Sequence, residues 1–117
     1  MSMKKFDLVE REANGTAVID IVGELTMGGG TDVILEKVQG KIAVGHRLLL
    51  INMGQCKRVD SHGLGELVKC LITAARHDAH LLLTNVPSQI LGIMKLTNLH
   101  KSFDIHDTEE DALEEQG

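Results

Sequence analysis

The spacing of apolar residues along the chain predicts strands first and then a regular alternation of strands and helices. Two apolar segments at the start are separated by Asn14-Gly15, a dipeptide typical of tight hairpin turns. The first segment, residues 6–12, alternates only in part. The second, residues 16–25, is apolar on both faces except at Asp20, which is typical of a strand covered on both sides. The fold should therefore begin with a hairpin.

The next segment predicts one helix followed by a central strand. Residues 26–30 read as a flexible connection, after which Thr31 can cap a helix that should close at Gly45. The continuous apolar run at residues 48–53 is too short for a helix and fits a buried parallel strand. Residues 55–59 are then expected to form a loop.

The second half of the chain repeats this alternation. Its strongest signal is a long amphipathic stripe after residue 60, and its last helical segment opens with a capping-box pattern. The predicted elements are a helix from Asp60-Ser61 to residues 76–78, a strand at 81–84, a helix from Pro87 to Asn98, a strand at 103–106 and an acidic helix at about 108–117.

This order predicts an α/β fold with a mostly parallel sheet, an antiparallel edge from the first hairpin and four helices. The chain has 117 residues, of which 43% are hydrophobic and 25% charged. These values fit one domain over residues 1–117 with a core that needs neither disulfides nor a structural metal.

Charge and composition exclude several partner classes. Residues 104–117 hold seven acidic residues and no lysine or arginine, so the net charge of −5 comes from this tail and says little about the body. The chain has two phenylalanines and no tryptophan or tyrosine, which argues against stacking of nucleic-acid bases. Without a signal-like start or a run of roughly 20 apolar residues, we expect a cytoplasmic protein that does not insert into a membrane.

Histidines and cysteines give weaker signals. His77 and His80 have a spacing seen in some metal sites, but no third ligand is near in the sequence, so surface histidines are the better interpretation. Cys56 lies beside Lys57-Arg58, which would lower a thiol pKa, yet inert, half-buried thiols are the more frequent case for Cys56 and Cys70. We expect no cofactor and no metal.

The most informative segment is Val59-Asp60-Ser61-His62-Gly63-Leu64-Gly65, which places a hydroxyl where a parallel strand leads into a helix. The two glycines each cost about 0.5–1 kcal/mol relative to alanine in a helix. Close approach of a backbone or a phosphate could offset this cost, and so could helix packing. We expect both glycines to serve access to the site more than folding. A hydrolase is disfavoured, because adjacent residues project in different directions and no nucleophile elbow surrounds the serine.

Several segments together resemble the STAS domain family, of the anti-sigma factor antagonist type. The resemblance spans nearly the whole chain, and its most specific part is the Asp-Ser-x-Gly-Leu-Gly element at residues 60–65. The other matching segments are Gly23-Glu24-Leu25, residues 81–85 with Pro87-Ser88, residues 96–99 with Phe103, and residues 107–113.

The resemblance implies a partner switch without catalysis by this chain. In such proteins the hydroxyl residue after the aspartate, here Ser61, is phosphorylated by an anti-sigma factor that is a serine kinase, and a PP2C-type phosphatase reverses the reaction. The unphosphorylated protein binds the kinase and releases its sigma factor. The implied partner-binding residues are Asp60, His62, Gly63, Leu64, Gly65, Gly28, Gly29 and Gly30.

Two segments depart from the family pattern. His62 stands where relatives usually carry a small residue and enlarges the contact surface beside Ser61. The segment Thr26-Met27-Gly28-Gly29-Gly30 replaces a more polar loop, which lies near the partner-binding surface in the family. A second function therefore stays open: a STAS subunit of a transport or lipid-trafficking complex that binds a small ligand or an ATPase without being phosphorylated.

Overall fold

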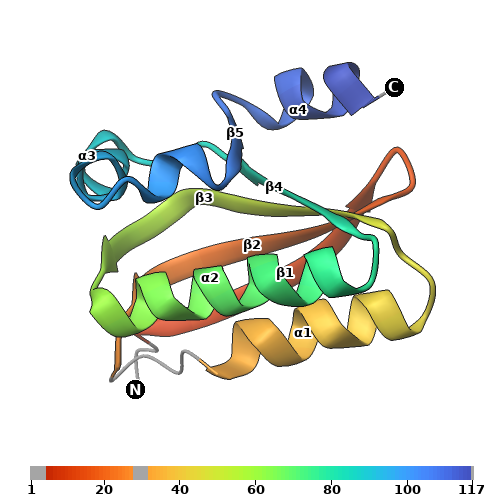
Figure 1. The fold of residues 1–117 in the computed structure, drawn as a ribbon, viewed down its shortest axis with the longest axis horizontal. Helices are drawn as coiled ribbons and strands as arrows, with labels where there is room; N and C mark the ends of the chain where they lie inside the picture. The colour runs from red at the N-terminus through yellow and green to blue at the C-terminus, as the bar shows by residue number, and fades with distance from the viewer. Residues whose placement is uncertain (1–4, 28–31, 117) are drawn as a thin grey trace.

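Five strands form one mixed sheet, as the sequence predicts. The computed structural model describes residues 5–27 and 32–116. The sheet order is β1-β2-β3-β4-β5, with β1 antiparallel to β2 and the other neighbours parallel (Figure 1). The elements are β1 Phe6–Ala13, β2 Thr16–Leu25, α1 Asp32–Ala43, β3 Leu48–Val59, α2 Ser61–Arg76, β4 His80–Thr84, α3 Ser88–Leu96, the 3-10 helix η2 Leu99–Lys101, β5 Asp104–His106 and α4 Glu109–Gln116.

Helices cover the two faces of the sheet unequally. On one face, alternate strand residues such as Ile19 and Ile51 form the main core with α1, α2 and α3, and α1 and α2 lie side by side there (Figure 1). On the other face Val18, Leu50 and Leu82 pack against Ala112 of α4. The double cover explains why the central strands are apolar in both directions. Among the described residues, no helix is long and apolar enough to cross a bilayer.

The expected loop at residues 55–59 is wrong, because β3 continues to Val59. Its outer half stays paired with β2, from Val22 opposite Gln55 to Leu25 opposite Val59, with one irregularity in the register just before this stretch and one within it. Most residues in this stretch are polar, so the spacing of apolar residues did not indicate a strand here. Backbone pairing and bulges, which the pattern does not reveal, decide where this strand ends.

Smaller differences occur at the ends of two helices. Pro87 is the residue before α3 and not part of it, and Thr97 follows the helix while Asn98 takes a left-handed conformation (φ 61°). One of the two hydrogen bonds of the predicted capping box is present at α4: the Asp111 N–H donates to Thr108 Oγ1 at 3.1 Å.

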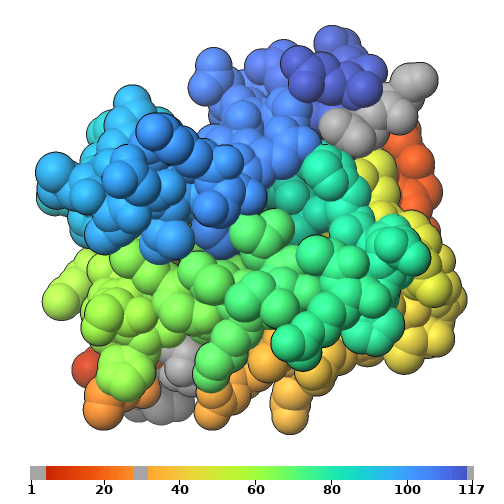
Figure 2. All heavy atoms as spheres, in the orientation of Figure 1, coloured from red at the N-terminus to blue at the C-terminus, as the bar shows by residue number. Residues whose placement is uncertain are grey.

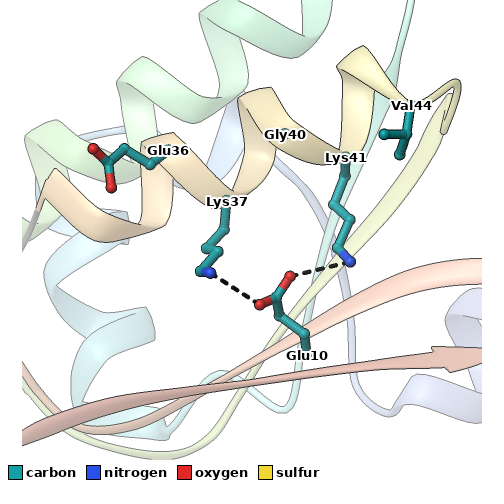
Figure 3. Close-up of a pocket in the computed structure, with 6 residues that line it drawn as sticks. All are labelled: Glu10, Glu36, Lys37, Gly40, Lys41 and Val44. Carbon is teal, nitrogen blue, oxygen red and sulfur yellow. Dashed lines mark ion pairs between the residues drawn. The ribbon is translucent and has the colours of Figure 1, made fainter.

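Ion pairs fasten α1 to the edge strand. Glu10 of β1 lies between Lys37 and Lys41 of α1, with N–O distances of 3.1 and 3.0 Å (Figure 3). The hydrogen bonds from Lys41 and then Lys37 lower the pKa of the Glu10 carboxyl. Because the three side chains are all in contact with solvent, the pairs orient the helix more than they stabilise the fold.

A polar cluster joins four elements on the other face of the sheet. Asp20 accepts two hydrogen bonds from Arg11, at 2.7 and 2.9 Å, and one from Asn52 at 2.9 Å. Arg11 also pairs with Glu109 of α4, and Asn85 donates to Asn52 Oδ1 at 3.0 Å. The bonds to Glu109 and Asp20 raise the pKa of the Arg11 guanidinium, which keeps it charged. This cluster links the hairpin, the central strand and α4.

We expect Asp20→Asn to lower the free energy of unfolding by about 1–3 kcal/mol, because it removes one of the two charged acceptors of the half-buried Arg11. Chemical denaturation measures the change. Glu12→Gln, on the neighbouring strand and exposed, makes the same change in charge and should stay within about 0.5 kcal/mol of wild type. Equal losses for the two variants would contradict a specific role for the cluster.

Candidate functional site

The site lies where β3 passes directly into α2. Asp60 is the only residue between them and has an extended backbone (φ −110°, ψ −174°), which makes it the N-cap of the helix. Its side chain accepts a hydrogen bond from the Gly63 N–H at 2.9 Å, and its carbonyl accepts one from the Leu64 N–H at 2.9 Å. An aspartate cap satisfies a helix donor that would otherwise lack a partner.

The same carboxylate also holds the end of the hairpin. Its second oxygen accepts a hydrogen bond from the Met27 N–H at 3.0 Å, beyond the end of β2. The bonds from Met27 and then Gly63 lower the pKa of Asp60 from its ordinary value of 3.8. A lowered carboxyl pKa adds stability above the ordinary pKa, and this contribution is lost as the pH falls through the lowered value. Asp60 therefore links two segments at neutral pH.

Residues 61–65 divide into an exposed and a buried set. Ser61 and His62 are exposed, Gly65 is half-buried, and Gly63 and Leu64 are buried. A partner that docks on this turn can therefore touch Ser61 and His62. Gly63 and Leu64 lie behind the exposed pair, and partner contact at these two residues stays a prediction.

Gly63 is the point at which α2 rests on β2. A Cβ atom at this position would lie 2.0 Å from the backbone oxygen of Leu25, which is far inside contact distance. The prediction that this glycine serves access rather than folding is thus wrong, because close backbone packing requires it. A Cβ at Gly65 would meet nothing within 4 Å, so packing does not explain that glycine.

The glycine run at residues 28–30 lies outside the described residues, but Met27 just before it does not. Its side chain is 66% exposed, and its backbone is fixed to Asp60. Sequence reasoning missed Met27 as a site residue. The signal was its place in the connection after Gly23-Glu24-Leu25, and only the fold brings that connection to α2.

The two cysteines have the environment of inert thiols. Both are buried, and burial raises the pKa of Cys56 and raises the pKa of Cys70 to about 12. At Cys56 the effect of burial on the thiol pKa therefore outweighs any lowering by the neighbouring Lys57 and Arg58.

The histidine pair and the hydrolase interpretation find no geometric support. His77 bonds to the Thr73 carbonyl oxygen, whereas His80 pairs with Asp104. Within residues 5–27 and 32–116, no group of three or more histidine, cysteine or acidic side chains could hold a metal. The carboxylate of Asp60 is occupied by backbone N–H groups, so it does not orient a histidine toward Ser61.

Comparison with known proteins agrees with this geometry. The sequence model of the STAS domain family matches residues 7–112. The chain belongs to the STAS domain family.

Several solved structures share its fold at low sequence identity. A Thermotoga maritima protein with a proposed role as an anti-sigma factor antagonist has 19% identity and a TM-score of 0.84, covering 92% of each chain. The anti-sigma factor antagonist SpoIIAA in its unphosphorylated form has 22% identity and a TM-score of 0.70, over 94% of this chain and 96% of that one. The murine anion transporter Slc26a9 has 17% identity and a TM-score of 0.74, over 88% of this chain and 18% of that one.

The two glycines of the STAS domain's site should respond oppositely to alanine. Gly63→Ala forces a Cβ against the Leu25 carbonyl and should lower the free energy of unfolding by about 1–3 kcal/mol or more. Gly65→Ala has free space and should raise it by about 0.5–1 kcal/mol while lowering partner affinity. Thermal melts and a binding titration measure both effects. Similar melting temperatures for the two variants would refute the distinct packing roles.

Proposed function

We propose that this STAS domain is an anti-sigma factor antagonist that changes partners when Ser61 is phosphorylated. Unphosphorylated, it binds an anti-sigma factor that is also a serine kinase and thereby frees a sigma factor. Phosphorylation releases it, and a PP2C-type phosphatase restores the binding form. The proposal places it in bacterial transcription control in the cytoplasm, as a binding protein rather than an enzyme.

The observation that carries the proposal is the exposed hydroxyl of Ser61 at the first residue of a 16-residue helix. A kinase can reach this hydroxyl without unfolding the site. The first turn of α2 holds no acidic residue, and the Asp60 carboxylate before it already accepts hydrogen bonds from two backbone N–H groups. The helix dipole at this N-terminus favours an added phosphate of about −1.5 to −2 charges. The domain can thus accept phosphate and keep its fold.

Release of the partner follows from where that charge is added. Ser61 stands beside His62 in the exposed set, so a phosphate lies on the surface a partner would cover. Burying a new dianion without a matched cation costs several kcal/mol, which is enough to dissociate a moderate complex. SpoIIAA, which shares the fold, has been solved in a phosphorylated form as well.

Variants at Ser61 test the switch. Labelled ATP and cell extract should place phosphate on Ser61 of wild type, located by mass spectrometry, and on no residue of Ser61→Ala. Ser61→Asp should keep the circular dichroism of wild type but bind the purified kinase about tenfold more weakly or worse. Ser61→Ala should bind constitutively. If Ser61→Asp bound as tightly as wild type, the switch would be refuted.

Besides capping α2, Asp60 should promote phosphorylation of Ser61 through its negative charge. Asparagine can accept one of the two backbone hydrogen bonds but presents an NH₂ group to the other donor. We expect Asp60→Asn to slow initial phosphorylation of Ser61 by about tenfold, since it removes the negative charge beside the hydroxyl that the kinase must approach. Asp32→Asn removes a charge from the exposed start of α1 and is the control. Initial rates equal to wild type at the same kinase and ATP concentrations would contradict the charge role.

The likeness to part of Slc26a9 keeps a transport role as the second candidate. A STAS subunit of a transport or lipid-trafficking complex would bind a small ligand or an ATPase without phosphorylation. The labelling experiment separates the two candidates, because a transport subunit leaves Ser61 unlabelled and Ser61→Asp indistinguishable from wild type in partner binding.

A further inference from the structure

The outer end of β3, residues 55–59, has a strand neighbour on one side only. β4 pairs with β3 from Leu48 to Asn52 and ends at Thr84, after which the chain turns toward α3. Past Asn52, β3 pairs with β2 alone among the described residues. The backbone groups on its other edge therefore have no ladder partner, a feature that an extended peptide can recognise.

A groove of about 350 Å³ runs between this edge and α3. Its strand side is formed by Lys57, Arg58 and Val59, and its helix side by Gln89, Ile90 and Ile93. Figure 2 shows the atoms of α3 directly beside those of the β3 end and the start of α2. The groove is thus built by the elements that flank the proposed phosphorylation site.

The two sides of the groove differ in chemistry. Lys57 and Arg58 are exposed, and their side chains form no hydrogen bond or ion pair with the described residues. On α3, Ile93 is 37% exposed and Leu96, which lies on the same helix face, is 87% exposed. One rim is therefore cationic and the other, apart from Gln89, is apolar, which suits a segment that carries both acidic and apolar side chains.

The groove is continuous with the proposed switch. Val59 lines it and is followed directly by Asp60 and Ser61. A partner segment lying along β3 would thus end at the phosphorylated residue. A phosphate there would also repel an acidic occupant, so the groove and the switch would act in the same direction.

We propose that this groove binds an extended acidic and apolar segment of the switch partner, which pairs with the free edge of β3 and places its carboxylates on Lys57 and Arg58. This inference rests on the proposed function for the identity of the partner. The recognition chemistry itself requires no phosphate, so it can be tested on the unphosphorylated chain.

A synthetic probe tests the groove without the kinase. A blocked peptide of alternating glutamate and valine, added to the labelled full chain, should shift the amide resonances of Lys57, Arg58 and Ile93. Arg58→Glu should weaken its binding by about tenfold, whereas Arg76→Glu, an exposed arginine at the other end of α2, should stay within about twofold. No shifts in the groove, or equal shifts with a lysine and valine peptide, would overturn the proposal. Concentration-dependent shifts at these residues without peptide would make a second copy the occupant and overturn it as well.

The kinase reaction separates failure of the groove from failure of the switch. Leu96→Asp and Arg58→Glu should each lower Ser61 phosphorylation about tenfold at limiting substrate and recover at high substrate, because they weaken docking and leave the hydroxyl intact. Val44→Asp, 76% exposed after α1, is the matched control for Leu96→Asp. If all variants were phosphorylated like wild type, the groove proposal would fail while the switch stood. If wild type were not phosphorylated at Ser61, the proposed function would fail, and the peptide result would decide the groove alone.

Discussion

The geometry of the site depends on the two hydrogen bonds that the Asp60 carboxylate accepts, because they join the start of α2 to the end of the hairpin. One oxygen caps α2 through the Gly63 N–H, and the other fixes Met27 at the end of the hairpin. Because the pKa of Asp60 is lowered by these bonds, the carboxylate stays charged and both bonds persist at neutral pH. The exposed turn with Ser61 is thereby fixed relative to the connection that follows β2.

A close backbone contact supplies the second constraint at this point. Gly63 lets the first turn of α2 approach the Leu25 carbonyl more closely than any side chain allows. The helix N-terminus is therefore held against the end of β2 by packing and by the cap together. Such a rigid support suits a switch, since a charge added at Ser61 then alters the surface and leaves the backbone in place.

The sheet places the proposed switch at the carboxyl ends of two neighbouring strands. The carboxyl ends of β2 and β3 meet there, and open α/β sheets bind partners at such ends. On the opposite face, the cluster around Asp20 and Arg11 fastens α4 and keeps it away from that end. The acidic tail is thus a structural cover for a sheet face, and its charge is spatially separate from the cationic rim of the groove.

Local patterns in the sequence were enough for the order of elements and for the STAS motif. Alternating and helical apolar spacing predicted the mixed α/β sheet, and Asp60 with Ser61 predicted a helix start that carries a hydroxyl. These features depend on residues that are close in the sequence, so a short segment is enough to predict them. The sequence could not show whether Asp60 caps the helix or presents its charge to a kinase, because an aspartate suits both roles.

Only the tertiary structure decided how distant segments meet. The backbone of Leu25 gives Gly63 its packing role, the Met27 N–H gives Asp60 its second bond, and pairing with β2 makes residues 55–59 a strand although their side chains look like a loop. Each of these depends on a backbone group elsewhere in the chain. Since every residue carries the same backbone N–H and C=O, the sequence does not show which of them will be near, and the packing of the sheet settles it.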